Sequence, residues 1–514
     1  MSPILLSAAL LLQRAQNTSA DHHNEASPQF QGWTVGPSQR GTANIILTCA
    51  ATTFLCCWVS VYPNIIAPRD SRWAAFRDKL SLACLNLLGP EFLIILAAGQ
   101  KSSARQSVKG FHDAGYTDWT MTHAFFADMG GFRLEAPGLK ESIPIDGEQL
   151  VYLVEHKFLE YPNVTKGDIE DRDKADMMSR LLTVGQAIWF SLNLLVRGIQ
   201  GLTVTRIELT TASFVINLIG TAWFWKDKPC GIQTSIILKS PEHIDFIMTN
   251  RGTRPFPPYY RTQLDFISRH ETEFNIWWQF YNTMARRILG FSPLMRHVHS
   301  QPWDRIPGDL FLPMDLDLHL WAVLLIAIFT SVPFMAWNSV FPSSIEQILW
   351  RTASVFMIVF NVYAFVSLSP AKMAIMPIKR PFEKSLLEKK YDQLAANKRF
   401  AQKLNPVLNQ VFEPQEVIVG QEKHQQGITV VEVRPHRSSP KEVMKTVYRK
   451  LYYFAENKDP RLAVNRLWVA CLGILCLAYV VVRGYIFVED LAGLRSLPSD
   501  AYDMPDWLAI IPHL

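Results

Sequence analysis

Apolar and polar residues alternate in long blocks along this chain, and seven apolar blocks approach the length of a membrane-spanning helix. A bilayer core of about 30 Å needs roughly 20 apolar helical residues. Within lipid, only helices and closed β-barrels satisfy all of their backbone hydrogen-bonding groups. The ten-residue alternating strands of a barrel are not seen in this sequence. The pattern predicts an all-α polytopic membrane bundle of about seven transmembrane helices. The seven blocks are Ala43–Ile66, Leu80–Gly99, Leu182–Ile199, Ile207–Trp225, Leu318–Trp337, Ser344–Ser367 and Val464–Val488.

The blocks also predict how the chain is divided, with helical excursions in the long loops. The first run, MSPILLSAALLLQ, resembles the core of a signal peptide, although no Lys or Arg precedes it. The expected order is a signal peptide at 1–20, an N-terminal segment and first helical hairpin at 21–99, an aromatic-rich loop at 100–181, a second helical hairpin at 182–225, a hydrophilic loop at 226–317, a third helical hairpin at 318–368, a charged loop at 369–462, and a last helix with a C-terminal tail at 463–514.

The orientation of this bundle stays open between two readings. The long loops hold most of the Lys and Arg, notably Lys384 to Lys403, and the positive-inside rule places them in the cytoplasm. A cleaved signal peptide would place them in the lumen instead, and a re-entrant segment at Pro90 would change the count. Asn17 and Asn163 begin glycosylation acceptor triplets, which are used only on the lumenal side.

Composition adds little to the pattern. The chain is 49% hydrophobic with a mean hydropathy of +0.06, so it is too polar to lie in the membrane throughout. A net charge of +5 over 514 residues fits contact with anionic membrane lipids and argues against nucleic acid. Six of seven cysteines lie in apolar blocks, and no CxxC pair suggests a metal site. We expect no metal and no cofactor.

One polar loop is unusually aromatic. Residues 104–135 contain the block WTMTHAFFADMGGF at 119–132. We expect its four aromatics to pack against the bundle, since they would otherwise form an exposed apolar patch. Gly130-Gly131 is expected to end a helix there. A second polar segment, 384–404, has helical periodicity and reads as an interfacial or solvated packing helix. The four aromatics are Trp119, Phe125, Phe126 and Phe132.

Known catalytic motifs are missing from the sequence. It contains no P-loop, GxGxxG fingerprint, GxSxG elbow, DDxxD motif or histidine box. What remains is a set of ionisable residues at membrane level, where a charge is costly and marks a candidate site. Each of them also has a structural interpretation as a helix-end or interfacial salt bridge. They are Glu91, Arg197, Glu208, Glu346 and Arg351.

The alternative to that structural interpretation is an acid–base pocket for a lipophilic substrate. A carboxyl group held away from water can keep its proton near neutrality and act as a general acid on an epoxide or alkene. Indole and phenyl faces can then stabilise cationic intermediates. Glu208 is expected to pair with Arg197 or Arg206, and Glu346 to approach Arg351 after a cap by Ser344.

Residues are assigned to this pocket as follows. The candidate acids are Glu346, Glu208 and Glu91, with His123 and Asp128 as a reserve acid–base pair. The candidate substrate-binding residues are Arg197, Arg351, Trp350 and Trp119.

Several blocks carry a resemblance that covers nearly the whole chain from about Trp33. They are GPSQRGTANIILTC, WTMTHAFFADMGGF, RGIQGLTVTRIELTTASF, WNSVFPSSIEQILWR and LRSLPSDAYDMPDWLAIIPHL. The chain resembles a large, mostly uncharacterised family of fungal polytopic membrane proteins. The resemblance implies an endomembrane protein, of the endoplasmic reticulum or a related compartment, that accompanies natural-product pathways.

Two functions from different classes follow. The first is a membrane-embedded terpene or meroterpenoid cyclase or isomerase that protonates a prenylated or epoxidised substrate. It rests on analogy with other fungal cyclases, since no cyclase motif maps onto this sequence. The second is a non-enzymatic sensor, transporter or scaffold.

Overall fold

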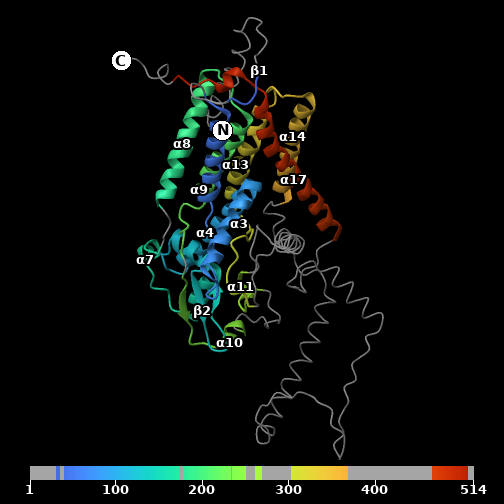
Figure 1. Ribbon diagram of the computed structural model, residues 1–514. Helices are drawn as coiled ribbons and strands as arrows, with labels where there is room; N and C mark the ends of the chain where they lie inside the picture. Colours follow the sequence, from blue (N-terminus) through green and yellow to red (C-terminus); the bar gives the residue numbers. More distant parts are fainter. Residues whose placement is uncertain are drawn as a thin grey trace, which may run out of the picture. The chain divides into compact units, whose positions relative to one another are not determined.

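The computed structural model describes residues 30–34, 40–172, 177–232, 234–249, 261–268, 302–367 and 466–506, which belong to one compact unit. The expected signal peptide, Asn17 and the helix predicted at 384–404 lie outside these ranges. The described chain is mostly helical (Figure 1). Its longer helices are α2 (Thr42–Val59), α3 (Arg72–Leu88), α4 (Pro90–Asp113), α8 (Met177–Ile199), α9 (Arg206–Phe224), α13 (Leu316–Met335), α14 (Ser344–Ser367) and α17 (Arg466–Ala492).

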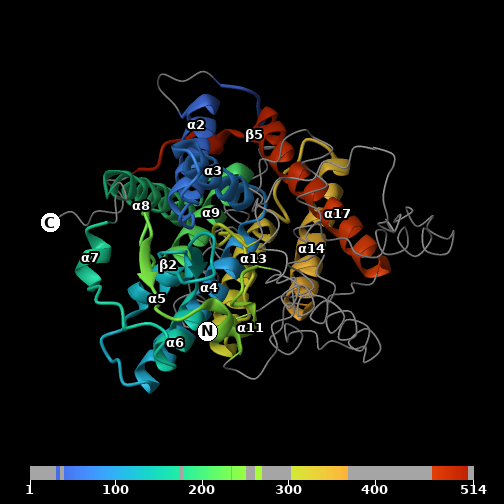
Figure 2. The ribbon, with the colours of Figure 1, turned by 90° about the horizontal axis from the view of Figure 1, so that it is seen from below.

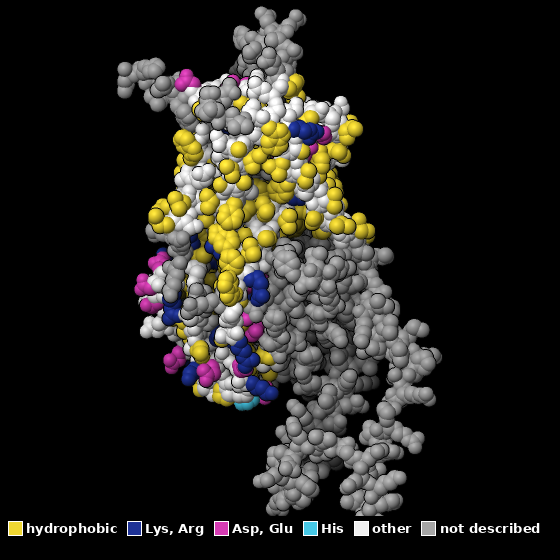
Figure 3. Space-filling view, viewed as in Figure 1, with side chains coloured by type: hydrophobic (Ala, Val, Ile, Leu, Met, Phe, Trp, Pro, Cys, Tyr) yellow, Lys and Arg dark blue, Asp and Glu magenta, His cyan; other side chains and the backbone are white. Residues whose placement is uncertain are grey.

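Five of these helices are long and apolar enough to cross a membrane. They are α2, α9 and α13 in full, residues 178–199 of α8 and residues 344–364 of α14. Their outer faces carry large exposed apolar side chains, such as Leu182 and Ile188 on α8 and Val359 on α14. Figure 3 shows these side chains gathered over the upper part of the molecule, with charged groups mostly below them. A contiguous apolar surface of this kind suits lipid and not water, so the membrane assignment is supported.

Helix α9 is the centre of the bundle. It packs against α2, α4, α8, α13 and α17. In both ribbon views α14 and α17 lie side by side at the edge opposite α8 (Figures 1 and 2). Buried amides join the helices: Asn217 of α9 donates to Asn86 of α3 (2.6 Å), which donates to Ser60 after α2 (2.6 Å). Interhelical hydrogen bonds of this kind hold helices together where lipid offers no hydrophobic drive.

The block Leu80–Gly99, predicted as one span, is instead the turn of a helical hairpin. Helix α3 ends at Leu88 and α4 begins at Pro90, which lacks the N–H that would continue the ladder. Asp78 of α3 pairs with Arg305, and Gln100 of α4 donates to the carbonyl of Gly308 (3.2 Å), so both arms return to the same segment. The turn lies against Tyr479, half-way along α17.

A small α/β substructure follows this hairpin and was not predicted. Strand β2 (Phe132–Glu135) pairs antiparallel with β3 (Ile143–Ile145) and parallel with β4 (Ile236–Lys239). The short helices of this part of the chain are α5 (Met121–Asp128), α6 (Gly147–Glu155), α7 (Lys166–Glu170), α10 (Ile244–Thr249) and α11 (Asp265–Ser268) (Figures 1 and 2). The expected all-α fold is therefore corrected to a mostly helical fold with a three-stranded sheet.

The aromatic block is buried in this substructure, as the sequence predicts. Trp119, Phe125, Phe126 and Phe132 are all at most 1% exposed, and α5 packs against α4. Helix α5 ends at Asp128, and Gly130 follows with φ +88, a conformation that favours glycine. The expected burial of these four rings and the glycine stop are both confirmed.

The two ends of the described chain meet on the other side of the bundle. Strand β1 (Phe30–Gln31) pairs with β5 (Leu497–Pro498), which lies between two short 3-10 helices, Gly493–Arg495 and Ser499–Tyr502. The hydroxyl of Tyr502 donates to the carbonyl of Gly32 (2.9 Å). The segments before α2 and after α17 therefore lie on one face.

Candidate functional site

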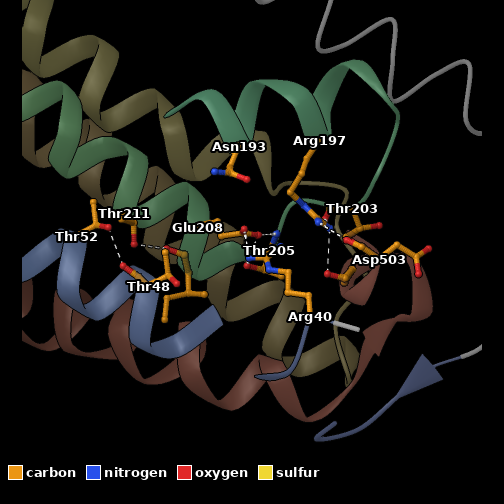
Figure 4. Close-up of polar contacts among 12 residues, drawn as sticks. Arg40, Thr48, Thr52, Asn193, Arg197, Thr203, Thr205, Glu208, Thr211 and Asp503 are labelled. Carbon is orange, nitrogen blue, oxygen red and sulfur yellow. Dashed lines mark hydrogen bonds and ion pairs between the residues drawn. The ribbon is translucent and has the colours of Figure 1, made fainter. Parts of the chain in front are cut away.

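Glu208 and Arg197, both expected at a site, serve the structure of this end of the bundle. Glu208 accepts from the backbone N–H (2.9 Å) and hydroxyl (2.8 Å) of Thr205, which closes the capping box of α9, and it pairs with Arg40 (Figure 4). Arg197 donates to the carbonyls of Thr203 (2.8 Å) and Asp503 (2.8 Å) and to that of Ala501 (3.0 Å). The expected pairing of Glu208 with Arg197 or Arg206 does not occur.

Glu346 and Arg351 also have other partners than expected. Glu346 pairs with Arg495, and its N–H is capped by Ser343, not Ser344 (3.3 Å). Arg351 donates twice to the carbonyl of Trp337 (3.1 Å each). These contacts correct the predicted approach of Glu346 to Arg351.

Arg206 and Trp350 complete this end of the bundle. Arg206 pairs with Glu489 (3.2 Å) and donates to the carbonyl of Val340 (3.0 Å). Trp350 is buried and donates to the carbonyl of Pro333 (3.2 Å). Its polar atom is therefore committed to a neighbouring helix.

Glu91 and His123 are buried and held by the chain itself. Tyr479 donates to Glu91 (2.8 Å) at the hairpin turn. The ring of His123 accepts at Nδ1 from the N–H of Thr120 (3.1 Å), and its Nε2 faces the carbonyl of Val164 (2.9 Å). Burial lowers the pKa of His123. The indole of Trp119 stacks on this imidazole at 5.1 Å, so both belong to the packed core.

Asp128 does not contact His123 and instead borders two small cavities. Its Oδ1 accepts from the N–H of Gly147 (2.9 Å), while Oδ2 is buried without a donor among the described residues, although the hydroxyl of Ser103 approaches it. Burial and the neighbouring charge of Asp146 raise the pKa of Asp128 to about 7. The expected His123–Asp128 pair is therefore not assembled.

Lys228 lines the smaller of these two cavities together with Asp128. Its ammonium donates to Gln100 (2.8 Å), to Asn64 (3.1 Å) and to the carbonyl of Tyr62 (2.8 Å). Burial lowers the pKa of Lys228 to about 7. Two cavities of about 20 and 60 Å³ border Asp128, and only the smaller also touches Lys228. A water needs about 10–15 Å³ of such space, so these cavities hold from one to a few waters and no prenylated substrate.

A pH-dependent stability follows from Asp128. Its pKa lies above the usual 3.8, so the folded state resists ionisation, and stability falls as pH rises from about 4 to about 7. We expect Asp128→Asn to remove this loss, about 2–4 kcal/mol. The melting temperature of the variant in detergent should therefore gain on the parent between pH 4.5 and 7.5. Ser107→Ala, a buried neighbour that does not titrate, should give a constant offset. A constant offset for Asp128→Asn as well would contradict the account.

A larger cavity lies between α2, α3, α9 and α17 and opens to the outer surface of the bundle, where Phe54, Leu80 and Leu491 are exposed. Its volume is about 370 Å³, within the usual range for small-molecule sites. Most of its lining is apolar, and the aromatic rings of Phe54, Trp58 and Phe487 border it. One carboxyl group, that of Asp490, reaches it from the last turn of α17. The remaining lining residues are Cys49, Ala50, Thr53, Cys57, Leu80, Ala83, Cys84, Leu87, Ile207, Thr210, Thr211 and Leu491.

Asp490 differs from the other acids at this level of the bundle. It is 3% exposed, and neither carboxyl oxygen has a hydrogen-bond donor among the described residues. The hydroxyl of Thr210 approaches without reaching hydrogen-bond geometry. Glu208, Glu346 and Glu489 are each paired with an arginine. A buried carboxyl without a partner is costly, so its place beside a cavity points to a ligand.

Sequence reasoning missed Asp490 because it ended the last span at Val488. Helix α17 continues to Ala492, which brings Glu489 and Asp490 into the bundle. Arg483 could have indicated Asp490, since a cation inside an apolar block usually has an anion near it, and one on the same helix face is a candidate. Positions 483 and 490 are seven apart, or two turns, and so share a face.

Comparison with known proteins gives one match. Residues 5–249 match a family of unknown function, DUF8562. No curated protein and no solved structure matches the chain. The matched residues include α2, α3 and α9, so three of the four helices around the large cavity fall within them.

The geometry allows one kind of chemistry better than others. An apolar cavity with a single carboxyl and three aromatic rings can bind a lipophilic molecule, donate a proton to it and stabilise positive charge on it. Among the described residues, no group of three His, Cys, Asp or Glu side chains is placed to hold a metal ion.

Proposed function

We propose that this protein is a membrane-embedded enzyme that binds a lipophilic small molecule in the α2–α3–α9–α17 cavity and protonates it through Asp490. The reaction class is an isomerisation or cyclisation. The observation that carries the proposal is an unpartnered buried carboxyl at the edge of an apolar cavity of about 370 Å³. Asp490 thereby replaces Glu91, Glu208 and Glu346 as the preferred acid, since those three carboxyls are hydrogen-bonded or paired.

The cavity is suited to a molecule that arrives from the bilayer. Phe54, Leu80 and Leu491 border it and are 62%, 41% and 46% exposed on the outer surface, where lipid would lie. The volume of about 370 Å³ lies toward the lower end of the range for small-molecule sites. A prenylated or epoxidised intermediate of fungal secondary metabolism is a substrate of this size and polarity.

The proposal includes a membrane arrangement. β1 and β5 pair across the chain ends, so an even number of crossings separates them. We therefore count α17 as a sixth crossing beside the five candidate spans, and treat the α3–α4 hairpin as re-entrant in place of the seventh. Its turn lies eleven residues from Asp78 and from Gln100, or about 16 Å along a helix, near half a bilayer core. An endomembrane such as the endoplasmic reticulum is the proposed location.

A second candidate is a sensor or carrier that binds the same molecule without changing it. The observation that favours it is the lack of a base: among the described lining residues, none is His, Lys or Arg. An enzyme without such a base would have to end the reaction by proton loss to water or to the Asp490 carboxylate.

Both candidate functions require that a lipophilic molecule binds in the cavity, and a substitution that fills the cavity tests this requirement. We expect the parent protein, purified in mild detergent, to carry a lipophilic molecule that extraction and mass spectrometry detect. Ala83→Phe should lower its occupancy about tenfold, because Ala83 lines the cavity and the added ring takes up its volume. Val184→Phe adds the same ring on the exposed face of α8 and should leave occupancy unchanged. Equal occupancy in all three proteins would contradict ligand binding in this cavity.

A further inference from the structure

We infer that the cavity selects a neutral amphiphile: an apolar body with one hydroxyl group that hydrogen-bonds with Asp490. The inference rests on the proposed function, since it names the class of ligand for the same cavity. Three observations carry it: the polarity of the cavity along its length, the balance of buried charge around Asp490, and the position of Phe487.

Polar groups gather at one end of the cavity. Thr210 and Thr211 of α9 lie near Asp490, and Cys49 of α2 lies near both Thr211 and Asp490. Thr53 donates to Thr211 (3.3 Å) at the same end. A ligand with one polar head and a long apolar tail matches this gradient.

The far end of the cavity is apolar. It is lined by Trp58 of α2 and by Leu80, Ala83 and Cys84 of α3. Cys49 and Trp58 are nine residues apart on one helix, which corresponds to about 13 Å. The cavity therefore offers an apolar tract of that length below the polar head.

The charged groups around the polar end have partners of opposite sign when Asp490 holds its proton. Arg206 and Glu489 form a direct pair (3.2 Å). Arg483 is 2% exposed, and its charge acts on the buried carboxyl of Glu91. Asp490 is neutral when it holds the proton that it donates in the proposed reaction, so an ammonium or carboxylate head group would meet no opposite charge there, and burying an unpaired charge is costly. A hydroxyl can hydrogen-bond with the neutral carboxyl and brings no charge.

Phe487 separates the cavity from Arg483. Its ring lines the cavity and lies 5.0 Å from the guanidinium of Arg483, which also faces the rings of Phe214 (5.5 Å) and Phe329 (5.3 Å). Arg483 is not among the cavity-lining residues. An anionic head group in the cavity would therefore meet Asp490 and not Arg483, which excludes lipophilic carboxylates.

Three photoreactive probes test the selection. They share one chain of about twelve carbons with a diazirine and differ only in the head group: a primary alcohol, a primary amine or a carboxylate. The full-length protein in nanodiscs is labelled with each, with and without excess unlabelled analogue. We expect the alcohol to give saturable labelling of α2 and α3 peptides, at least tenfold above the amine and the carboxylate.

Variants at the head-group end complete the test. Asp490→Leu should lower alcohol labelling about tenfold, whereas Asp490→Asn, whose carbonyl still accepts a hydrogen bond, should retain most of it. Asp503→Asn, an exposed carboxyl near the same end, should leave labelling unchanged. Equal or stronger labelling by the amine or the carboxylate would overturn the neutral-ligand inference and leave ligand binding standing. Absence of saturable labelling by all three probes would overturn the proposed function itself.

Discussion

Arg197→Ala is expected to lower the free energy of unfolding by about 3–5 kcal/mol, the scale of the loss when one partner of a buried charge interaction is removed. Arg197 is 1% exposed and donates to the carbonyls of Thr203, Ala501 and Asp503. Alanine leaves these carbonyls without donors and leaves a cavity the size of the side chain. The segment after α17 should detach from α8, because Arg197 is its main polar anchor to that helix.

Denaturant titration of the protein in mixed micelles measures this effect. Arg105→Ala removes an exposed pair with Asp317 and should cost at most about 1 kcal/mol. Arg197→Lys should recover only part of the loss, since an ammonium cannot reach three carbonyls in the geometry of the guanidinium. A cost for Arg197→Ala as small as that for Arg105→Ala would show that the C-terminal segment is held by other contacts.

The helices of the bundle were largely predictable from the sequence, because an apolar block of 20 residues has few alternatives in lipid. The prediction of one span over Leu80–Gly99 was wrong because the mean hydropathy of the block does not reveal a single helix break within it. Gly89-Pro90 ends α3 and starts α4, and the hairpin that follows depends on contacts with Arg305 and Tyr479 far along the chain. The three-stranded sheet was missed because its strands are three or four residues long and β4 lies about a hundred residues beyond β2.

The ionisable residues were found by the sequence, but their partners were not. Glu208 pairs with Arg40 and Glu346 with Arg495, over separations of 168 and 149 residues. Spacing along one helix favours near neighbours such as Arg351 and cannot supply such partners. Asp490 was missed for a simpler reason: α17 extends to Ala492, four residues past the end of the apolar block from which the helix was predicted.

Asp490→Asn is expected to lower turnover by ~10²–10⁴-fold, the usual loss when a general acid loses its proton. Asparagine keeps the shape of the side chain and its acceptor oxygen, so the substrate should still bind while proton donation is lost. Glu91→Gln, Glu208→Gln and Glu346→Gln should change stability more than turnover, because these groups are engaged in structural contacts.

The most direct test is conversion of a prenyl-epoxide intermediate by membranes from a heterologous host that expresses the parent protein, Asp490→Asn or Asp503→Asn at equal levels. Asp503→Asn, an exposed carboxyl outside the cavity, serves as the matched control. We expect cyclised or isomerised product from the parent and from Asp503→Asn, and little or none from Asp490→Asn. Full conversion by Asp490→Asn would contradict Asp490 as the acid, and no conversion by the parent would contradict the enzyme itself.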